Sequence, residues 1–338
     1  MTPPPDAASS GLHMPILLDP VYKEYVWGGN RFETELHRRV LPGTIAESWE
    51  VADHPDGHTR ILNGPFANLT LAEALRQDCE GLLGTGRRAE RFPLMVKLID
   101  ARETLSVQVH PDDETAPLVG GEAKAEMWVV LEATPDAHIY SGFHPGVTPE
   151  VFEEARAKGT IPSLLQRYPA RPGMVFYTPG GRVHAIGAGC LLLEVQQNSN
   201  TTYRIYDWDR LDRNGPPRPL HLAKALRVIR WDLSESPIAP VLPEVFLHDG
   251  MTSREILATP HFLVDEWRVE GPATHTLDGS GFVILFPTDA DLRIRTPHQP
   301  AMILRKNATC LMPAALRSFD LRPADPSRPT RVLSIRLP

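Results

Sequence analysis

The sequence is poor in cysteine, in clustered basic residues and in long apolar runs, and each shortage excludes a class of protein. Only three of its 338 residues are cysteine, and no two form a CxxC pair, which excludes a disulfide framework and fits a reducing cytosol. The formal net charge is −7 with no offsetting basic block, which argues against nucleic acid as a partner. No run reaches transmembrane length, and the N-terminus does not resemble a signal peptide. We therefore expect a cytoplasmic protein that binds neither nucleic acid nor membranes.

Proline, by contrast, is abundant, and its 34 copies predict many short strands and loops rather than long helices. The fold class expected is therefore mainly β, with a few helices. The length of the chain allows two domains. Residues 1–12 begin with a Pro/Ser/Ala-rich stretch and are predicted to be a disordered tail.

Local patterns place the expected elements along the chain. Strand patterns cover residues 47–51, 92–99, 104–110, 127–131, 174–177, 191–195, 261–269 and 281–286. Thr70 to Glu73 matches a capping box, and residues 74–83 continue it as one helix that ends at Gly84. Further helices are predicted after Thr148-Pro149 and over residues 222–229.

The most informative stretch runs from Gly173 to Arg210. A strand leads into the turn Pro179-Gly180-Gly181, whose backbone freedom can aim His184 inward from a rigid edge. The apolar run 191–195 contains one carboxylate, which is typical of a buried strand beside a polar site. A dense polar string from 196 to 204 follows it and indicates a functional site.

Possible metal ligands lie on the strands around this stretch. Gln108 and His110 are two residues apart, so their side chains point to the same face of a strand. Glu126 begins the next strand pattern, and His184 completes a set of nitrogen and oxygen ligands that suits Zn²⁺ with one position left open. A single histidine on a strand is more often simply hydrogen-bonded, and sequence alone does not separate Zn²⁺ from Mn²⁺ or Fe²⁺.

Three stretches carry a family resemblance. The spacing of Gly173, Pro179, Gly181 and His184 resembles the second signature of the cupin barrel. The runs LSVQVHPDD, KAEMW and HAIGAGCLLLEVQQNSNTTYRIYDWDR resemble the type I mannose-6-phosphate isomerases, and the resemblance extends over residues 27–229. It implies a catalytic, metal-binding cupin (jelly-roll) domain at 13–236, followed by a degenerate cupin-like domain at 237–338.

The resemblance also implies residue roles. It marks Gln108, His110, Glu126 and His184 as ligands of one Zn²⁺ per chain. It marks Ser106 and Lys97 as phosphate contacts, although a structural ion pair is a competing explanation for Lys97. It marks Arg204 as catalytic, and because an arginine stays protonated we expect it to stabilise the charge of an enediolate intermediate. Lys124 is then the candidate for moving the proton, unless it only balances the charge of the site.

The predicted function is interconversion of mannose 6-phosphate and fructose 6-phosphate, with a sugar phosphate as the small-molecule partner. Two alternatives stay open: another metal-dependent cupin sugar-phosphate isomerase, and a non-catalytic sugar-binding cupin regulator. The oligomeric state is open, with a monomer as one possibility. Asn200 departs from the family, which usually has Asp there.

A faint repeat in the C-terminal part supports a second barrel. Asn307, Pro313, Ala315 and Ser318 follow the spacing of Gly173, Pro179, Gly181 and His184. Only the proline is identical, and Ser318 occupies the ligand position. We therefore expect a second barrel half that binds no metal.

Overall fold

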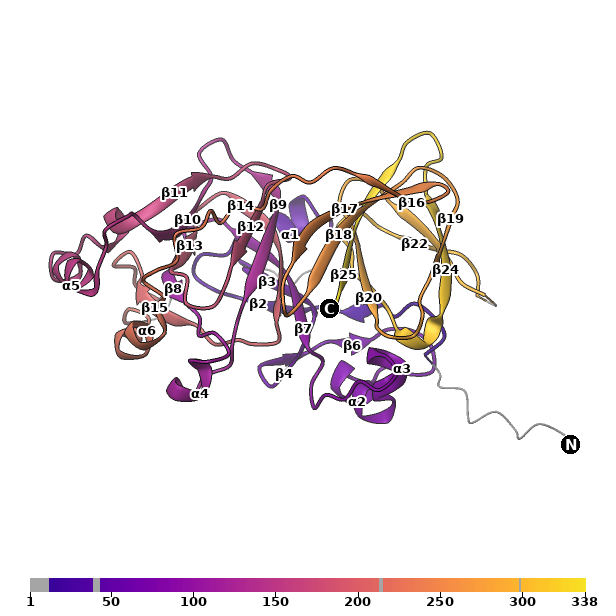
Figure 1. Cartoon of the computed structure of the whole chain (residues 1–338), viewed down its shortest axis with the longest axis horizontal. Helices are drawn as coiled ribbons and strands as arrows, with labels where there is room; N and C mark the ends of the chain where they lie inside the picture. The colour runs from indigo at the N-terminus through magenta and orange to yellow at the C-terminus, as the bar shows by residue number, and fades with distance from the viewer. Residues whose placement is uncertain (1–11, 39–42, 213–214, 298) are drawn as a thin grey trace, which may run out of the picture. The chain divides into compact units, whose positions relative to one another are not determined.

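The computed structural model describes residues 12–38, 43–212, 215–297 and 299–338. It is built mainly of strands, with a few short helices, as the prolines and the strand patterns predicted (Figure 1). Residues 1–11 of the predicted disordered tail lie outside the described residues, and Leu12, the last residue of that predicted tail, is buried.

The chain divides into two compact units. One contains Val21–Glu50 and Leu94–Pro240, and we call its β-structure the first barrel. The other contains residues 12–20, Val51–Pro93 and Val241–Pro338, and its β-structure is the second barrel. The division into domains at 13–236 and 237–338 stays a prediction; by contacts, Val51–Pro93 group with the second barrel.

The first barrel consists of two antiparallel sheets. The larger has the order β12 (Val175–Thr178), β9 (Glu126–Ala133), β14 (Cys190–Gln197), β7 (Leu94–Ala101), β3 (Glu47–Val51) and β2 (Val21–Lys23). The smaller has the order β11 (Leu165–Pro169), β10 (His138–Phe143), β13 (His184–Ile186), β8 (Val107–Val109) and β15 (Tyr203–Tyr206). The helical elements of this unit are α1 (Arg31–Thr34), α4 (Ala116–Val119), α5 (Pro149–Ala157), η1 (Ile161–Leu164) and α6 (Leu222–Val228).

Alternation of side chains along these strands separates the inside of the barrel from its outside. Apolar residues from both sheets, among them Trp128, Leu192 and Ile186, form one core cluster between the sheets. On the opposite face of the smaller sheet, Val107 and Val109 belong to a second cluster that also includes residues of α5 and α6. Consequently the residues between and beside these two valines, Ser106, Gln108 and His110, are directed to the interior.

The second barrel repeats this layout. Its larger sheet has the order β23 (Cys310–Met312), β20 (Val283–Pro287), β25 (Thr330–Arg336), β18 (Leu263–Val269), β17 (Met251–Ala258) and β16 (Val245–His248). Its smaller sheet has the order β22 (Met302–Leu304), β21 (Leu292–Arg295), β24 (Ser318–Pro323) and β19 (Ala273–Thr276). The same unit holds β1 (Leu18–Asp19), β4 (Asp53–His54), β5 (Gly57–His58), β6 (Arg60–Ile61), α2 (Leu71–Gln77), α3 (Cys79–Leu83) and η2 (Ala314–Leu316).

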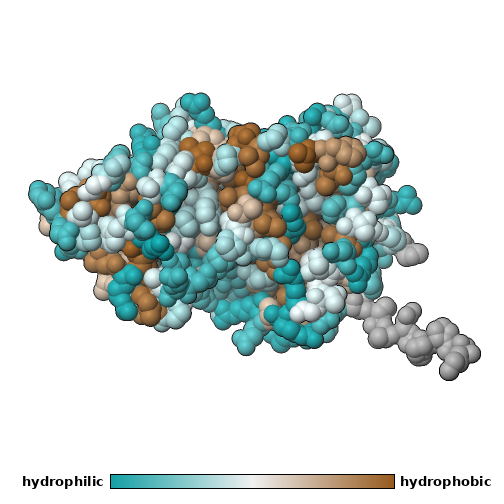
Figure 2. Space-filling view, in the orientation of Figure 1, coloured by the Kyte–Doolittle hydropathy of each residue, from teal (hydrophilic) through white to brown (hydrophobic). Residues whose placement is uncertain are grey.

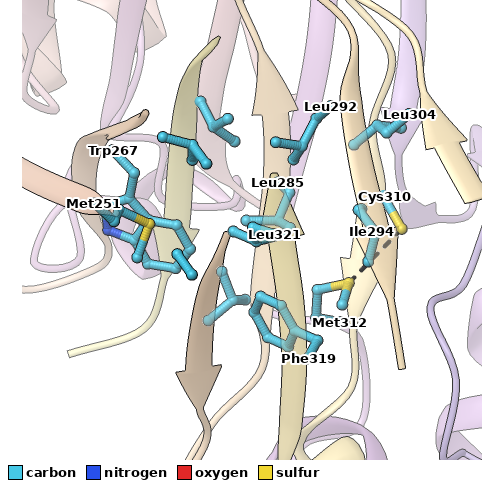
Figure 3. Packing of buried hydrophobic residues seen from close by; sticks show 14 of the residues in the cluster. Met251, Trp267, Leu285, Leu292, Ile294, Leu304, Cys310, Met312, Phe319 and Leu321 are labelled. Carbon is cyan, nitrogen blue, oxygen red and sulfur yellow. Dashed lines mark hydrogen bonds between the residues drawn. The ribbon is translucent and has the colours of Figure 1, made fainter. Parts of the chain in front are cut away.

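A hydrophobic core packs between the sheets of the second barrel (Figure 3). Leu285 and Trp267 come from the larger sheet, and Leu292, Phe319 and Leu321 come from the smaller one. All five are almost fully buried, and burial of a large apolar side chain contributes roughly 1.5–3 kcal/mol. The barrel therefore has its own hydrophobic core.

The faint repeat corresponds to a real structural repeat. In the first barrel, β12 ends just before Pro179, and the chain crosses to the smaller sheet, where β13 begins at His184. In the second barrel, β23 ends just before Pro313, and β24 of the smaller sheet begins at Ser318. With the matching strand orders, this confirms two cupin-type barrels.

The capping box at Thr70 is confirmed, but the single helix predicted after it is wrong. Thr70 accepts a hydrogen bond from the Glu73 backbone, and the Glu73 side chain accepts one from Thr70. The helix breaks at Asp78, which leaves helical geometry and caps a new helix, α3, by accepting from the Gly81 amide. Aspartate competes for backbone donors in this way, which favours a cap over a helix interior.

Strand β16 is the edge of its sheet and exposes Val245 and Phe246. Figure 2, in the orientation of Figure 1, shows apolar surface in the region of β16. Among the described residues, no helix combines the length and the apolar character needed to cross a membrane.

Candidate metal centre and active site

Strand register brings three of the predicted site residues into one row. His184 on β13 pairs with Gln108 on β8, and Gln108 pairs in turn with Arg204 on β15. Directly paired residues share a face of the sheet, so the three side chains lie next to one another on the inner face.

The turn Pro179-Gly180-Gly181 holds the strand that carries His184 against His110. The Gly181 amide donates to the His110 carbonyl oxygen over 2.8 Å. Gly181 has φ of +83°, and a Cβ atom on Gly180 would lie 2.5 Å from the Asp112 Cα atom. Both positions therefore require glycine, because the turn lies directly against the segment that follows β8.

His110, Glu126 and His184 form a buried cluster whose ligand atoms all lie within 4.8 Å of one another. The Nε2 atoms of His110 and His184 lie 3.4 Å and 3.1 Å from the same carboxylate oxygen of Glu126. Three of the four predicted ligands are thus together, contributed by β9, β13 and the end of β8.

The Nδ1 contacts of His110 and His184 determine which ring nitrogen carries the proton in each neutral imidazole. His110 Nδ1 lies 2.8 Å from the Thr201 carbonyl oxygen, and His184 Nδ1 lies 2.9 Å from the Arg182 carbonyl oxygen. A carbonyl oxygen only accepts, so each Nδ1 donates, and in its neutral form each ring presents an Nε2 lone pair to the cluster. Histidine ligands of metals are oriented by hydrogen bonds of this kind.

Burial and charge act on the ionisable groups of the cluster. Burial lowers the pKa of His110 to about 3, with the Lys124 ammonium acting in the same direction. Burial would raise the pKa of Glu126, but the Lys124 ammonium opposes it, and the pKa of this carboxyl lies well below its usual range. Neutral imidazole and ionised carboxylate are the forms that bind a divalent cation.

Gln108 lies beside the cluster with its amide nitrogen 3.3 Å from His184 Nε2. Its amide oxygen accepts a hydrogen bond from Ser106 Oγ over 3.3 Å. Half a turn of the amide would exchange the two atoms without moving the side chain and would direct the oxygen at the cluster. The structure therefore places the fourth predicted ligand next to the other three. Its amide nitrogen, and not its amide oxygen, points toward them.

Lys124 reaches the cluster although it precedes β9, which begins only at Glu126. Its Nζ lies 2.5 Å from Glu126 Oε2, 3.4 Å from His110 Nε2 and 3.8 Å from Glu194 Oε1. The side chain is buried, so its ammonium group lies inside the site, close enough to exchange a proton with a molecule bound beside the cluster.

Lys97 lies deeper in the barrel between two carboxylates. Its Nζ is 3.6 Å from Glu47 and 3.4 Å from Glu194, and it lies over the ring of Trp49. Burial lowers the pKa of Lys97, but Glu47 and Glu194 raise it by more. The side chain is therefore a buried cation that is already paired, as the competing explanation anticipated.

A cavity of about 240 Å³ opens beside the cluster. Its polar lining consists of Glu47, Lys97, Ser106, Gln108, Lys124, Glu194, Asn200, Thr202, Arg204 and Arg218, with Tyr25 and Trp27 among its other walls. All the predicted substrate and catalytic residues therefore line one space. Asn200, where the family usually has Asp, is part of this wall.

Arg204 and Arg218 contribute two positive charges to this cavity. Arg204 donates through Nη1 to the Pro219 carbonyl oxygen, and its backbone amide donates to His221. Arg218 forms a two-point ion pair with Asp207 at 2.8 Å and 2.7 Å. Burial and the proximity of Arg218 lower the pKa of Arg204, which is the expected response to an excess of positive charge.

Sequence reasoning missed several of these contributors. Glu194 was visible as the only carboxylate in a buried strand, but its role between Lys97 and Lys124 depends on cross-strand pairing. No motif marked Arg218, because it lies in the Pro-rich loop that follows the motif ending at Arg210. Glu47 lies in a predicted strand, but only the sheet order brings it beside β7.

Comparisons with known proteins agree with this geometry. The family described as phosphomannose isomerase type I, catalytic domain, matches residues 16–128. The chain is 37% identical to mannose-6-phosphate isomerase ManA of Bacillus subtilis (strain 168) over 262 residues, which are 77% of this chain and 81% of that protein. The chain belongs to the type I mannose-6-phosphate isomerase family.

Other members of the mannose-6-phosphate isomerase family extend the comparison. The enzyme of Streptococcus mutans is 35% identical over 258 residues, 76% of this chain and 79% of its own. A crystal structure of the Bacillus subtilis mannose 6-phosphate isomerase aligns with a TM-score of 0.84 at 31% identity, over 95% of this chain and 99% of that one. A mannose 6-phosphate isomerase structure bound with zinc and yttrium shares the fold at 15% identity and a TM-score of 0.71, over 95% of this chain and 98% of that one. The prediction of an isomerase with a cupin fold is thus confirmed.

Proposed function

We propose that this isomerase interconverts mannose 6-phosphate and fructose 6-phosphate at a single Zn²⁺ site in the first barrel. Its relatives carry that substrate in their names, and one structure of the same fold holds zinc. The proposed ligands are Gln108, His110, Glu126 and His184.

One observation supports the metal most directly. Two imidazole lone pairs and an ionised carboxylate converge in a buried space, and hydrogen bonds to backbone carbonyls hold both rings in that orientation. Lone pairs directed at a carboxylate repel it unless a cation lies between them. The ligand types and the oriented rings suit zinc with an open position for substrate.

The reaction transfers a proton between C1 and C2 of the open-chain sugar. A bound Zn²⁺ would supply Lewis acidity that polarises the carbonyl and the neighbouring hydroxyl. Arg204, permanently charged and held by Pro219, is proposed to stabilise the negative charge that develops on the enediolate oxygens. Lys124 is proposed to carry the proton, because its amine reaches the cluster and lines the cavity.

The phosphate group is proposed to bind at the cationic side of the same cavity. Ser106 would donate its hydroxyl, and Lys97 would contribute its ammonium charge. Arg218 adds to this role, since Asp207 engages its Nε and Nη2 atoms and the guanidinium also lines the cavity. Charge-assisted hydrogen bonds of this type are about twice as strong as neutral ones.

Metal removal and replacement test the proposal. The purified full-length chain is treated with chelator, its zinc content is measured, and turnover of mannose 6-phosphate is followed in a coupled assay. We expect activity to fall with zinc content and to return on addition of about one equivalent of Zn²⁺ per chain. Full turnover by the metal-free protein would refute the metal mechanism, and turnover of another aldose phosphate in preference to mannose 6-phosphate would refute the substrate.

A further inference from the structure

A second and larger cavity lies within the second barrel. Its volume is about 520 Å³, within the range of small-molecule sites. Its walls include β17, β18, β19, the segment leading into β20 and the end of β25. These elements correspond, by the matching strand orders, to those around the candidate active site. Nothing in the proposed reaction uses this cavity.

An ion pair lines this cavity. Arg336 on β25 pairs with Asp265 on β18, and their side chains are 36% and 14% exposed. Asp265 and Arg336 therefore present carboxylate oxygens and guanidinium N–H groups next to one another in the cavity.

Aromatic rings line the cavity next to this ion pair. His275 on β19 contacts Trp267 with ring centroids 4.5 Å apart, and both line the cavity. Burial lowers the pKa of His275 to about 4, with His248 and Arg336 acting in the same direction. The imidazole is therefore neutral near pH 7 and offers one donor and one acceptor.

The charges of this cavity balance, unlike those of the first. Arg87 and Arg336 are offset by Asp265 and Asp278 among the lining residues. In the first cavity, Lys97, Lys124, Arg204 and Arg218 outnumber Glu47 and Glu194. A phosphorylated ligand would meet two carboxylates in the second cavity without a surplus of cations, which disfavours an anion.

We propose that the cavity of the second barrel binds an uncharged hexose. A guanidinium–carboxylate pair presents donors and acceptors side by side, which matches the vicinal hydroxyls of a sugar ring. The indole and imidazole rings provide an amphipathic wall for its C–H face.

Ligand-observed NMR and calorimetry on the full-length protein test this site. The probes are the methyl glycosides of mannose, glucose and fructose, whose blocked anomeric carbon prevents ring opening and turnover. We expect at least one glycoside to bind and Arg336→Met to weaken it at least tenfold. Asp265→Asn, which keeps the size of the side chain but removes its charge, should weaken it severalfold and maintains the test if Arg336→Met does not fold.

A matched control lies on the same strand. Arg331 is 38% exposed, pairs with Glu266 rather than Asp265, and does not line the cavity. Arg331→Met should leave glycoside binding unchanged, and none of the three variants should alter kcat for mannose 6-phosphate. The proposal is overturned if no glycoside binds at millimolar concentrations, or if binding responds to Ser106→Ala and not to Arg336→Met, which would locate the sugar in the first cavity.

Discussion

The two barrels share their strand order but differ in the residues that line their cavities. In the first barrel, Thr178, just before Pro179, pairs with Glu126, and His184 pairs with Gln108. In the second, Met312, just before Pro313, pairs with Val283, and Ser318 pairs with Thr276. The positions of a carboxylate, an imidazole and an amide are thus held by valine, serine and threonine. One framework thus holds the proposed metal ligands in one copy and hydroxyl and apolar groups in the other.

The buried charges differ in the same way. Lys97 pairs with Glu194 on β14, which pairs with Trp128 on β9. The corresponding residues of the second barrel are Asp265 and Ser334, followed by Leu285. Away from these residues, apolar side chains pack between the two sheets of each barrel. The comparison teaches that the core maintains the fold while the residues around the cavity are free to change their chemistry.

The largest expected effect comes from removing a metal ligand. His184→Ala should lose bound zinc and reduce activity by more than about 100-fold, because losing a direct ligand costs more than losing the groups that orient it. Metal analysis and the coupled assay measure both losses. Ser318→Ala, at the equivalent position of the second barrel, should change neither. Full zinc occupancy in His184→Ala would contradict the ligand assignment.

Arg204→Met should have the next largest effect. Removing one fixed donor from the developing charge should lower kcat by roughly 100-fold while zinc content stays at the parent level. Exchange of the C2 proton with deuterated solvent should slow in parallel, since it passes through the same intermediate. The arginine of the second cavity is the comparison, and Arg336→Met should exchange and turn over like the parent. An unchanged rate for Arg204→Met would leave Arg204 with only a structural role.

Ser106→Ala should have a moderate effect confined to substrate binding. Loss of a hydrogen bond to a charged group should raise KM for mannose 6-phosphate by about tenfold and leave kcat nearly unchanged. Steady-state kinetics separate the two constants. Ser334→Ala, a buried serine of the other barrel, serves as the control with no change in either. An unchanged KM in Ser106→Ala would move the phosphate site elsewhere.

The smallest effect concerns a helix cap in each unit. Thr70→Ala removes the hydroxyl that accepts from the Glu73 amide over 3.2 Å before α2, while the backbone amide of residue 70 still donates to Glu73, and should cost about 1 kcal/mol of local stability. Hydrogen exchange of the α2 amides should accelerate by about fivefold. Thr148→Ala removes a longer contact, 3.4 Å from the Val151 amide, and should accelerate exchange in α5 by less. Equal effects would show that the shorter amide contact of Thr70 makes no stronger cap.

The local sequence determined much of this protein. Alternating and apolar patterns located β3, β7, β9, β14 and β18, since strand periodicity is a property of neighbouring residues. The Pro-Gly-Gly turn and the i, i+2 spacing of Gln108 and His110 pointed to a metal site for the same reason. The family resemblance rested on contiguous motifs and identified five of the residues that line the first cavity, namely Lys97, Ser106, Gln108, Lys124 and Arg204.

Only the tertiary structure decided which distant groups meet. Arg218 and Asp207, Lys97 and Glu47, and Arg336 and Asp265 are pairs formed by sheet order, strand register and loop packing. The second cavity had no motif at all, because Asp265, His275 and Arg336 come together only when three strands bring them around one space. Local patterns describe what a segment can form, whereas long-range pairing decides what its side chains touch.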